Sequence, residues 1–487
     1  MPRKISKELS RNQLYLENMF SHSIDLYSKP LRLFGINCCL FYFEGLSSLS
    51  DLSLAEYAAV SEQSSSIMSG EELFVYMKQC MALPAESTAP EDYEQVRQFL
   101  TAGASVLFIE GCSKALAFST QHMQFRSIQE PSGEGNIRAP REGFSEILRT
   151  NISLVRRLMR TESLVAKTSI IGEKTKTEVA LLYDRKLVNP ALISKVENQL
   201  KRIKLPILFD ASYLAPFLYK GPFSFFHHVG YTERPAVACA KLCEGKLIIL
   251  VGGTPFAMIL PYFFNENFES LDDYSSKAYF ASFIRCIKYI AFLVAILLPG
   301  MFVSIAGYTP ELFPPEFLYF IIAEDMKTPL PIFMEMSLTI VLIEIIREAG
   351  LRLPKSIGHT VGLVSALIIG DTAVKAGILS VSVVITAALS TISMLCIPSL
   401  YEPSTLLRLL FVLAAGLLGP IGVTALLFIT ILNICSINAF GIPFSSPFSP
   451  LGIGALRDGF IRLPWTFLAK KPFSIRDLPG GVKSANK

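Results

Sequence analysis

The pattern of apolar and polar positions divides the chain into two unlike parts. The C-terminal part contains three runs without a charged side chain: 22 residues between Lys288 and Glu311, 26 between Lys375 and Glu402, and 48 between Arg408 and Arg457. A helix needs about 20 apolar residues to cross the hydrocarbon layer of a bilayer. We therefore expect the C-terminal third or more of the chain to lie in a membrane and to carry the polar first part.

The apolar block is expected to form an all-helical membrane domain at residues 271–440 with about four to six spans. Its apolar segments are 289–308, 331–346, 356–377, 378–398 and 405–438. Arg285 and Lys288 are expected to snorkel at the cytosolic boundary, and the acidic, Pro-rich stretch 311–327 to form a loop on the outer face. A basic tail at 441–487 favours a cytosolic C-terminus.

The number of segments conflicts with this topology, because two cytosolic ends require an even number of crossings. Two alternatives remain open. Either the break at Gly416–Pro420 folds the last segment into a hairpin, or the segment 331–346, which carries two glutamates, does not fully span.

The polar part has an α/β pattern that occurs twice. Residues 31–46 are typical of a buried strand, helical patterns follow near 52–63, 70–82 and 91–102, and strands are expected at 105–109 and 115–119. About 141 residues later the order recurs, with LFYFEGL at 40–46 matching LLYDRKL at 181–187, and GASVLFIEG at 103–111 matching GKLIILVGG at 245–253. The pattern indicates two similar tandem subdomains.

The predicted fold class is therefore α+β: a cytosolic domain of two tandem α/β subdomains, followed by the polytopic membrane domain. The expected divisions are a polar extension (1–30), subdomain 1 (31–123), a linker with a basic helix (124–160), subdomain 2 (161–270), the membrane domain (271–440) and the tail (441–487). The N-terminus lacks the apolar region of a secretory signal, so we expect the first part to stay in the cytosol.

Composition argues against several functions. A formal net charge of +4 does not favour nucleic-acid binding, and no catalytic constellation or cofactor loop stands out, so neither an enzyme nor a cofactor is predicted. Gly252-Gly253 is expected to be a hairpin turn rather than a phosphate loop. Cys239 and Cys243, with the histidines at 227 and 228, could suggest a metal, but small core residues are the favoured interpretation.

Charges inside apolar segments are costly and call for a reason. Glu335, Glu344, Asp371 and Lys375 are either part of a polar ion pathway or interfacial and paired groups. A stripe of small residues, Gly358, Gly362, Ala366 and Gly370, lies on one face of the third segment and is expected to allow close helix packing. These residues, together with Ser365, are the candidates for pore or gating positions.

A helical pattern at 142–160 carries basic side chains on one face. They are Arg149, Arg156, Arg157 and Arg160. Such a face is either simply solvated, or it binds a partner subunit or anionic headgroups.

Several motifs resemble those of one known family. They are PREGFSEILRTNISLVRRLMR (140–160), IGEKTKTEVALLY (171–183), YTERP (231–235), LVGGTPFAMILP (250–261), REAGLRLPKSIGHTVGLVSALIIGDTAVKAGILS (347–380) and FGIPFSSPFSP (440–450). In these motifs the chain resembles the A subunits of GerA-type spore germinant receptors. It departs from the family's pattern at His359, Ser365 and Val381, where Gln, Gly and Pro are expected.

The resemblance implies a multi-pass protein of the spore inner membrane with its N-terminal domain facing the spore core. It implies a transporter-like B subunit and a lipoprotein C subunit as partners, and self-association into a ring, expected as a pentamer, that forms a germinant-gated ion channel. Two alternatives stay open. One is a non-conducting membrane scaffold or signal transducer, and the other is a stage V sporulation relative that amplifies germination.

Overall fold

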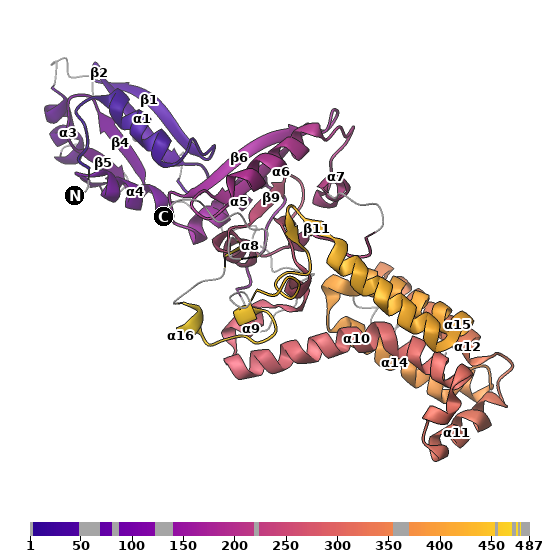
Figure 1. Cartoon of the computed structure of the whole chain (residues 1–487). Helices are drawn as coiled ribbons and strands as arrows, with labels where there is room; N and C mark the ends of the chain where they lie inside the picture. Colours follow the sequence, from indigo (N-terminus) through magenta and orange to yellow (C-terminus); the bar gives the residue numbers. More distant parts are fainter. Residues whose placement is uncertain are drawn as a thin grey trace.

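The computed structural model describes residues 3–47, 69–79, 87–121, 140–218, 224–353, 370–452, 456–469, 474–475 and 478. Two β-sheets with their helices form the N-terminal part, and long helices lying side by side form a bundle at the other end of the molecule (Figure 1). Mixed α/β structure followed by a helical region is the architecture expected from the apolar pattern.

The first sheet has the strand order β1-β2-β4-β5-β3. Its strands are β1 (Leu26–Leu33), β2 (Ile36–Phe43), β3 (Ser87–Thr88), β4 (Ser105–Ile109) and β5 (Ala115–Phe118). Helices α1 (Leu9–Met19) and α4 (Tyr93–Thr101) pack on one face, and α3 (Gly70–Gln79) packs on the other. Alternate residues of a strand point to opposite faces, so the apolar run of β2 supplies both cores.

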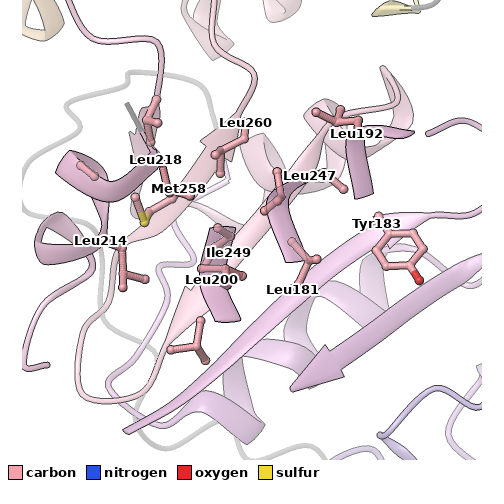
Figure 2. Packing of buried hydrophobic residues seen from close by; sticks show 14 of the residues in the cluster. Leu181, Tyr183, Leu192, Leu200, Leu214, Leu218, Leu247, Ile249, Met258 and Leu260 are labelled. Carbon is pink, nitrogen blue, oxygen red and sulfur yellow. The ribbon is translucent and has the colours of Figure 1, made fainter. Parts of the chain in front are cut away.

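The second sheet has the order β6-β7-β9-β10-β8, which repeats the first. Its strands are β6 (Leu164–Ile171), β7 (Thr177–Asp184), β8 (Gly230–Thr232), β9 (Leu247–Val251) and β10 (Ala257–Leu260). Helices α5 (Leu148–Leu158) and α8 (Pro235–Cys243) cover one face; α6 (Pro190–Arg202), η1 (Ala211–Leu214) and α7 (Ala215–Leu218) cover the other. Figure 2 shows the core between this sheet and α6, η1 and α7, where Leu181, Ile249 and Met258 of three strands meet Leu200 and Leu214.

The internal repeat predicted from the sequence is confirmed by strand order. The matched segments 40–46 and 181–187 contain the ends of β2 and β7, and the other matched pair forms β4 and β9. The turn at Gly252-Gly253 joins the antiparallel strands β9 and β10, as expected. The helical pattern near 52–63 lies outside the described residues.

The first subdomain begins earlier in the chain than predicted. The expected single strand at 31–46 is a hairpin, because Phe34 and Gly35 both have positive φ (49° and 86°) and form a two-residue turn. The expected polar extension contains α1 and most of β1, and Leu16 and Phe20 are fully buried in the core. An aromatic residue at the turn hid this reversal from sequence reasoning.

The helical region follows η2 (Phe264–Phe268) and α9 (Leu271–Ser275). Its elements are α10 (Ala278–Tyr308), η3 (Pro310–Leu312), α11 (Pro315–Asp325), α12 (Ile332–Arg352), α14 (Val381–Leu395), η4 (Pro398–Leu400) and α15 (Tyr401–Ser436). The stretch 311–327 was expected to be a loop, but most of it is α11. Proline at the first helical position favours such a start.

Two helical stretches of the described chain are long and apolar enough to cross a membrane, Ala278–Tyr308 and Pro398–Ser436. Four to six spans therefore remains a prediction. Helix α14 is apolar but short, with 15 residues. Helix α12 has 21 residues but carries several charged side chains.

Helix α15 turns back on itself at Gly419. This residue has φ 59° and ψ −138°, a conformation that suits glycine alone, and Pro420 starts the second arm. Both ends of α15 lie beside the second subdomain: Ser399 Oγ of η4, which leads into the first arm, donates to the Asn267 carbonyl of η2 (3.3 Å), and the N–H of Phe225 donates to Asn433 Oδ1 of the second arm (3.2 Å). The structure thus has the hairpin that was one of the two alternatives for the last apolar segment.

The reversal defines two ends of the bundle. The near end lies beside the sheets, and the far end contains Gly419 and Tyr308, whose hydroxyl donates to the Gly416 carbonyl (2.7 Å). Helices α10 and the first arm of α15 run from near to far. Helices α12 and α14 and the second arm run back, as the contacts of Glu344 with Tyr401 and of Glu335 with Ser380 require.

The C-terminal tail is docked rather than free. It contains β11 (Asn438–Ala439), β12 (Ile442–Pro443), η5 (Leu456–Asp458) and α16 (Trp465–Leu468). Ala439, Ile442, Ile475 and Leu478 are buried in the core of the second sheet. The tail was expected to be a basic extension, but its apolar residues complete a core whose other members lie between Val165 and Phe263.

Candidate functional site

Two carboxylates lie at the start of α14, at the far end of the bundle. Glu335 is fully buried, and its Oε2 accepts from the backbone N–H (3.0 Å) and the hydroxyl (2.7 Å) of Ser380. Glu324 of α11 accepts in the same way from Ser382 (3.2 and 3.0 Å). A helix N-terminus carries free N–H groups and partial positive charge, so both carboxylates stabilise α14 and hold it against α11 and α12.

A second polar network lies towards the near end. The Arg408 side chain is fully buried, and its Nη2 contacts Glu344 Oε1 (2.9 Å) while Nη1 donates to Thr391 Oγ1 (2.8 Å). Glu344 also accepts from the Tyr401 hydroxyl (2.9 Å) and from Arg347 Nε (2.9 Å). The network connects α12, α14 and α15. Pairing the charges offsets part of the free-energy cost of burying them.

The third pair, Asp371 and Lys375, has the i,i+4 contact expected from its spacing (2.6 Å). Its side chains are 56% and 74% exposed, so the pair faces away from the bundle of its own chain. A Cβ at Gly370 would meet nothing within 4 Å, so this position does not pack closely against described residues. Gly358, Gly362, Ser365 and Ala366 lie outside the described residues.

The structure thus places the predicted charges in three locations. Glu335 and Glu344 are nine residues apart on α12, about 14 Å along the axis, and each is engaged by a different helix terminus or side chain. Asp371 and Lys375 belong to neither network. Sequence reasoning missed Arg408, although a lone arginine inside an apolar helix is the signal of a paired partner on a neighbouring helix.

A further ionic cluster, also missed, joins the first bundle helix to the sheets. Arg285 was expected to snorkel, but its side chain is fully buried. Its Nε contacts Asp273 Oδ2 of α9 (2.8 Å) and its Nη1 contacts Asp458 Oδ1 of the tail (2.9 Å). Lys288 is also largely covered and donates to the Phe268 carbonyl (3.2 Å). The acidic stretch before the apolar run was the available signal.

Beside this ionic cluster, two lysines of the second subdomain contact three glutamates. Lys241 Nζ contacts Glu266 (2.6 Å), Glu244 (3.1 Å) and Glu269 (3.2 Å). Lys246 is fully buried and contacts Glu266 and, at 3.6 Å, Glu244. Since Lys241 and Lys246 flank the turn before β9, whereas Glu266 and Glu269 precede α9, the cluster fixes the sheet to the connection that leads into the bundle.

Burial and charge pull the pKa values of this cluster in opposite directions. Burial raises the pKa of Glu269 to about 7, although Lys241 lowers it. Burial would also raise the pKa of Glu266, but Lys241 and Lys246 outweigh it and bring that pKa to about 2. Burial alone would lower the pKa of Lys241, and Glu244 and the other carboxylates raise it well above its ordinary value.

The predicted basic face of α5 is not one surface. Arg156 is buried and binds Asp25 with two contacts, Nε to Oδ2 (2.8 Å) and Nη2 to Oδ1 (2.9 Å). Arg149 is partly exposed and contacts Glu44 (2.8 Å), and Arg157 contacts Glu142. Arg160 is exposed. Asp25 and Glu44 belong to the first subdomain, so two of the four arginines bind the other half of the same chain.

The cysteine and histidine residues do not form a metal centre in the part of the chain that the structure describes, where no group of three metal-binding side chains was found. Cys239 is buried, its thiol lies 3.8 Å from the Val155 carbonyl, and burial raises its pKa to about 12. A thiol with such a pKa is inert.

The matches to known proteins agree with the motifs. The family model of the Bacillus/Clostridium GerA spore germination protein matches residues 14–474. The chain belongs to this family. Membership confirms the resemblance predicted from the sequence and extends it from residue 14, inside α1, to α4, where the motifs gave no signal.

Two relatives from Bacillus subtilis (strain 168) illustrate the similarity. Spore germination protein KA is 33% identical over 389 residues, 80% of this chain and 72% of that protein. Spore germination protein B1 is 32% identical over 436 residues, 89% and 90% of the two chains. Each alignment is long enough that it must include part of the sheets and part of the bundle.

One solved structure is also similar: the N-terminal domain of the A subunit of the Bacillus megaterium spore germinant receptor GerK3. It covers 53% of this chain and 96% of that chain, with 22% identity and a TM-score of 0.43. This score is too low to carry an argument about a common fold.

Proposed function

We propose that the chain is the integral membrane A subunit of a nutrient germinant receptor that triggers spore germination. The observation that carries this proposal is the family match over residues 14–474, supported by relatives named as spore germination proteins. On this proposal the bundle lies in the spore inner membrane, and both sheets face the spore core.

The antiparallel order of the bundle supports six crossings. The described helices supply five passes: α10, α12, α14 and the two arms of α15. Helix α12 ends at the near end with Arg352, whereas the chain resumes at the far end, where a Cβ at Gly377 would lie 3.2 Å from the Lys327 carbonyl. Our candidate for the sixth crossing is the predicted apolar segment 356–377, most of which lies outside the described residues. Six crossings return the tail to the side of the sheets, as its docking requires.

Helices α12 and α14 would cross the membrane, although α12 carries charged side chains and α14 is short for a transmembrane helix. A helix inside a bundle is covered by its neighbours, so it can carry charged side chains if these have partners on neighbouring helices. Glu335 has Ser380, and Glu344 has Arg408, Tyr401 and Arg347. These contacts lower the cost of placing α12 at membrane depth, more so for Glu344, which is paired with arginines, than for Glu335, whose Oε1 has no hydrogen-bond partner among the described residues.

The same contacts suggest where ions would pass. Because Glu335, Glu344 and Arg408 are engaged within one chain, we place the conducting path between copies of the chain arranged in a ring, as the family resemblance implies. The exposed pair Asp371–Lys375 lies at the far end of this segment and faces outward from its own bundle, so it is our candidate for the entrance of that path. A transporter-like B subunit would bind the nutrient, and a lipoprotein C subunit would complete the receptor.

The test is ion flux from liposomes that contain the chain with its B and C subunits. Nutrient should release monovalent cations, and Asp371→Asn should change the rate or the selectivity. Glu348→Gln is the matched control, because Glu348 forms an i,i+4 pair with Arg352 (2.7 Å) of similar exposure at the near end. An assembled receptor that never conducts would instead support the non-conducting scaffold, and co-purification without a B subunit would support the stage V relative.

A further inference from the structure

The first turns of α10 combine a buried face with an exposed aromatic face. Ala281 and Arg285 are buried towards the sheets and the tail. Tyr279, Phe280 and Phe283 are 73%, 50% and 61% exposed. Large aromatic side chains at such exposure on one side of a helix indicate a surface that something outside the chain covers.

The tail segment 460–468 runs along the same helix. The Phe460 ring stacks on Tyr289 (4.5 Å between centroids), the N–H of Arg462 donates to Ser282 Oγ (3.0 Å), and the indole of Trp465 donates to the Tyr274 carbonyl (3.1 Å). These contacts follow α10 backwards from its fourth turn to α9. Figure 1 shows α9, α16 and the start of α10 near one another, below the sheets and to the left of the bundle.

This segment also presents apolar side chains outward. Ile461, Trp465 and Phe467 are all more than half exposed. The polar N–H of Trp465 is satisfied by protein, so the exposed part of the indole is its apolar ring. Tryptophan and tyrosine are the residues enriched where protein meets the headgroup level of a bilayer.

We propose that Tyr279, Phe280, Phe283, Ile461, Trp465 and Phe467 form an interfacial platform that lies on the bilayer surface nearest the sheets. The inference deepens the proposed function, because it rests on membrane insertion of the bundle. It assigns to the tail segment a contact with lipid, although that segment does not cross the membrane. Its partner is the boundary between headgroups and acyl chains.

Helix length supports this placement. The 31 residues of α10 are about 46 Å long, whereas the hydrocarbon layer is about 30 Å thick. About 16 Å, or ten to eleven residues, must therefore lie outside the hydrocarbon if the helix is not strongly tilted. The aromatic face occupies this surplus, and Ile290 and Leu293 continue exposed apolar surface from it towards the spanning part.

Charge supports a lipid partner over a second protein surface. Lys277 is exposed at the start of α10, and Lys470 and Lys471 follow α16 in the sequence. Each lysine near an anionic surface adds attraction to the headgroups. Exposed aromatic rings with flanking lysines are the composition of elements that lie in the membrane interface.

The test uses Trp465, the single tryptophan of the chain. The full-length chain is reconstituted into vesicles of zwitterionic and anionic phospholipid, and its emission is measured with bromine placed on the acyl chain near the headgroup or near the bilayer centre. Iodide in the aqueous phase is the third quencher. The platform predicts that bromine near the headgroup quenches most strongly and that iodide quenches several-fold less than it quenches free tryptophan.

Two other results would overturn the platform. Strong iodide quenching without bromolipid quenching would place Trp465 in water. Protection from all three quenchers would mean that protein covers it, such as a second copy of the chain or another subunit.

A companion variant separates the platform from membrane insertion itself. The double variant Trp465→Phe, Leu293→Trp moves the only tryptophan from α16 to a half-exposed position in the spanning part of α10. Bromine near the centre should quench it more than it quenches Trp465. If lipid quenches this variant but not the unaltered chain, the proposed platform is wrong while the membrane placement of the bundle stands. If neither is quenched by lipid, the membrane placement under the proposed function fails as well.

Discussion

Replacing Arg156 by alanine should loosen the junction between the two sheets far more than replacing Arg149, although both arginines lie on α5 and both bind the first subdomain. The Arg156 and Asp25 side chains are 1% and 4% exposed, and they share two contacts of 2.8 and 2.9 Å. The guanidinium also donates to the Leu164 carbonyl (2.9 Å) and lies over the Phe43 ring (4.7 Å).

The expected magnitude follows from burial. Removing one partner of a buried ion pair leaves an uncompensated charge and costs about 3–5 kcal/mol. An exposed pair contributes about 0–1 kcal/mol, and the Arg149 and Glu44 side chains are 32% and 34% exposed. Arg156→Ala should therefore destabilise the junction by at least about 2 kcal/mol more than Arg149→Ala. The double variant Asp25→Ala, Arg156→Ala should recover part of the loss, because it leaves no unpaired charge.

Hydrogen exchange of the full-length chain measures this locally. The N–H of Ile24 donates to the Ala166 carbonyl (3.1 Å) across the junction, and that of Ala166 donates to Ser23 Oγ (2.9 Å). A loss of about 3 kcal/mol should speed exchange at these amides about 100-fold, since 1.4 kcal/mol is tenfold. Equal exchange rates in the Arg156→Ala and Arg149→Ala variants would refute the reasoning.

Three further predictions concern the bundle and its connection to the sheets. Gly419→Ala should cost about 1–3 kcal/mol, because its φ of 59° suits glycine and a Cβ would meet the ring of Tyr308, whereas Gly370→Ala should have little effect; thermal unfolding in nanodiscs compares them. Glu335→Ala should cost about 1–3 kcal/mol by leaving the Ser380 donors unpaired, but Asp371→Ala, in an exposed pair, at most about 1 kcal/mol in the same assay. The pKa of Glu269 is raised to about 7 in the folded chain, so the native state binds an extra proton between the ordinary carboxyl pKa and pH 7. Stability should therefore fall as the pH rises towards and through 7. Melting temperatures measured over this pH range should show the fall, and Glu269→Gln should remove this part of the pH dependence.

Local pattern was sufficient to predict much of the fold. Buried strands such as β4 and β9 are short apolar runs followed by glycine turns, and their repetition indicated two sheets of the same strand order. The Gly–Pro break was a correct signal for the reversal in α15, because glycine and proline act through the local backbone. The turn at Phe34-Gly35 lacked the polar residues that usually mark a hairpin, so β1 was missed.

The candidate site was less predictable, since pairing is a property of the folded chain. Arg156 and Arg149 look equivalent on a helical projection, but only the folded arrangement shows that Asp25 meets the first and Glu44 the second. Likewise, Arg408 is 64 residues from its partner Glu344. Apolar runs predicted the helical segments that carry Glu344 and Arg408, whereas the partners across helices required the structure.

The most direct test of the central claim is nutrient-triggered cation release from spores in which this chain and the proposed B and C subunits are the sole germinant receptor. Release should begin after addition of a nutrient that the receptor recognises, and it should disappear when the gene for this chain alone is removed. It should return when the unaltered gene is restored. Unchanged release without the chain would contradict its role as the A subunit.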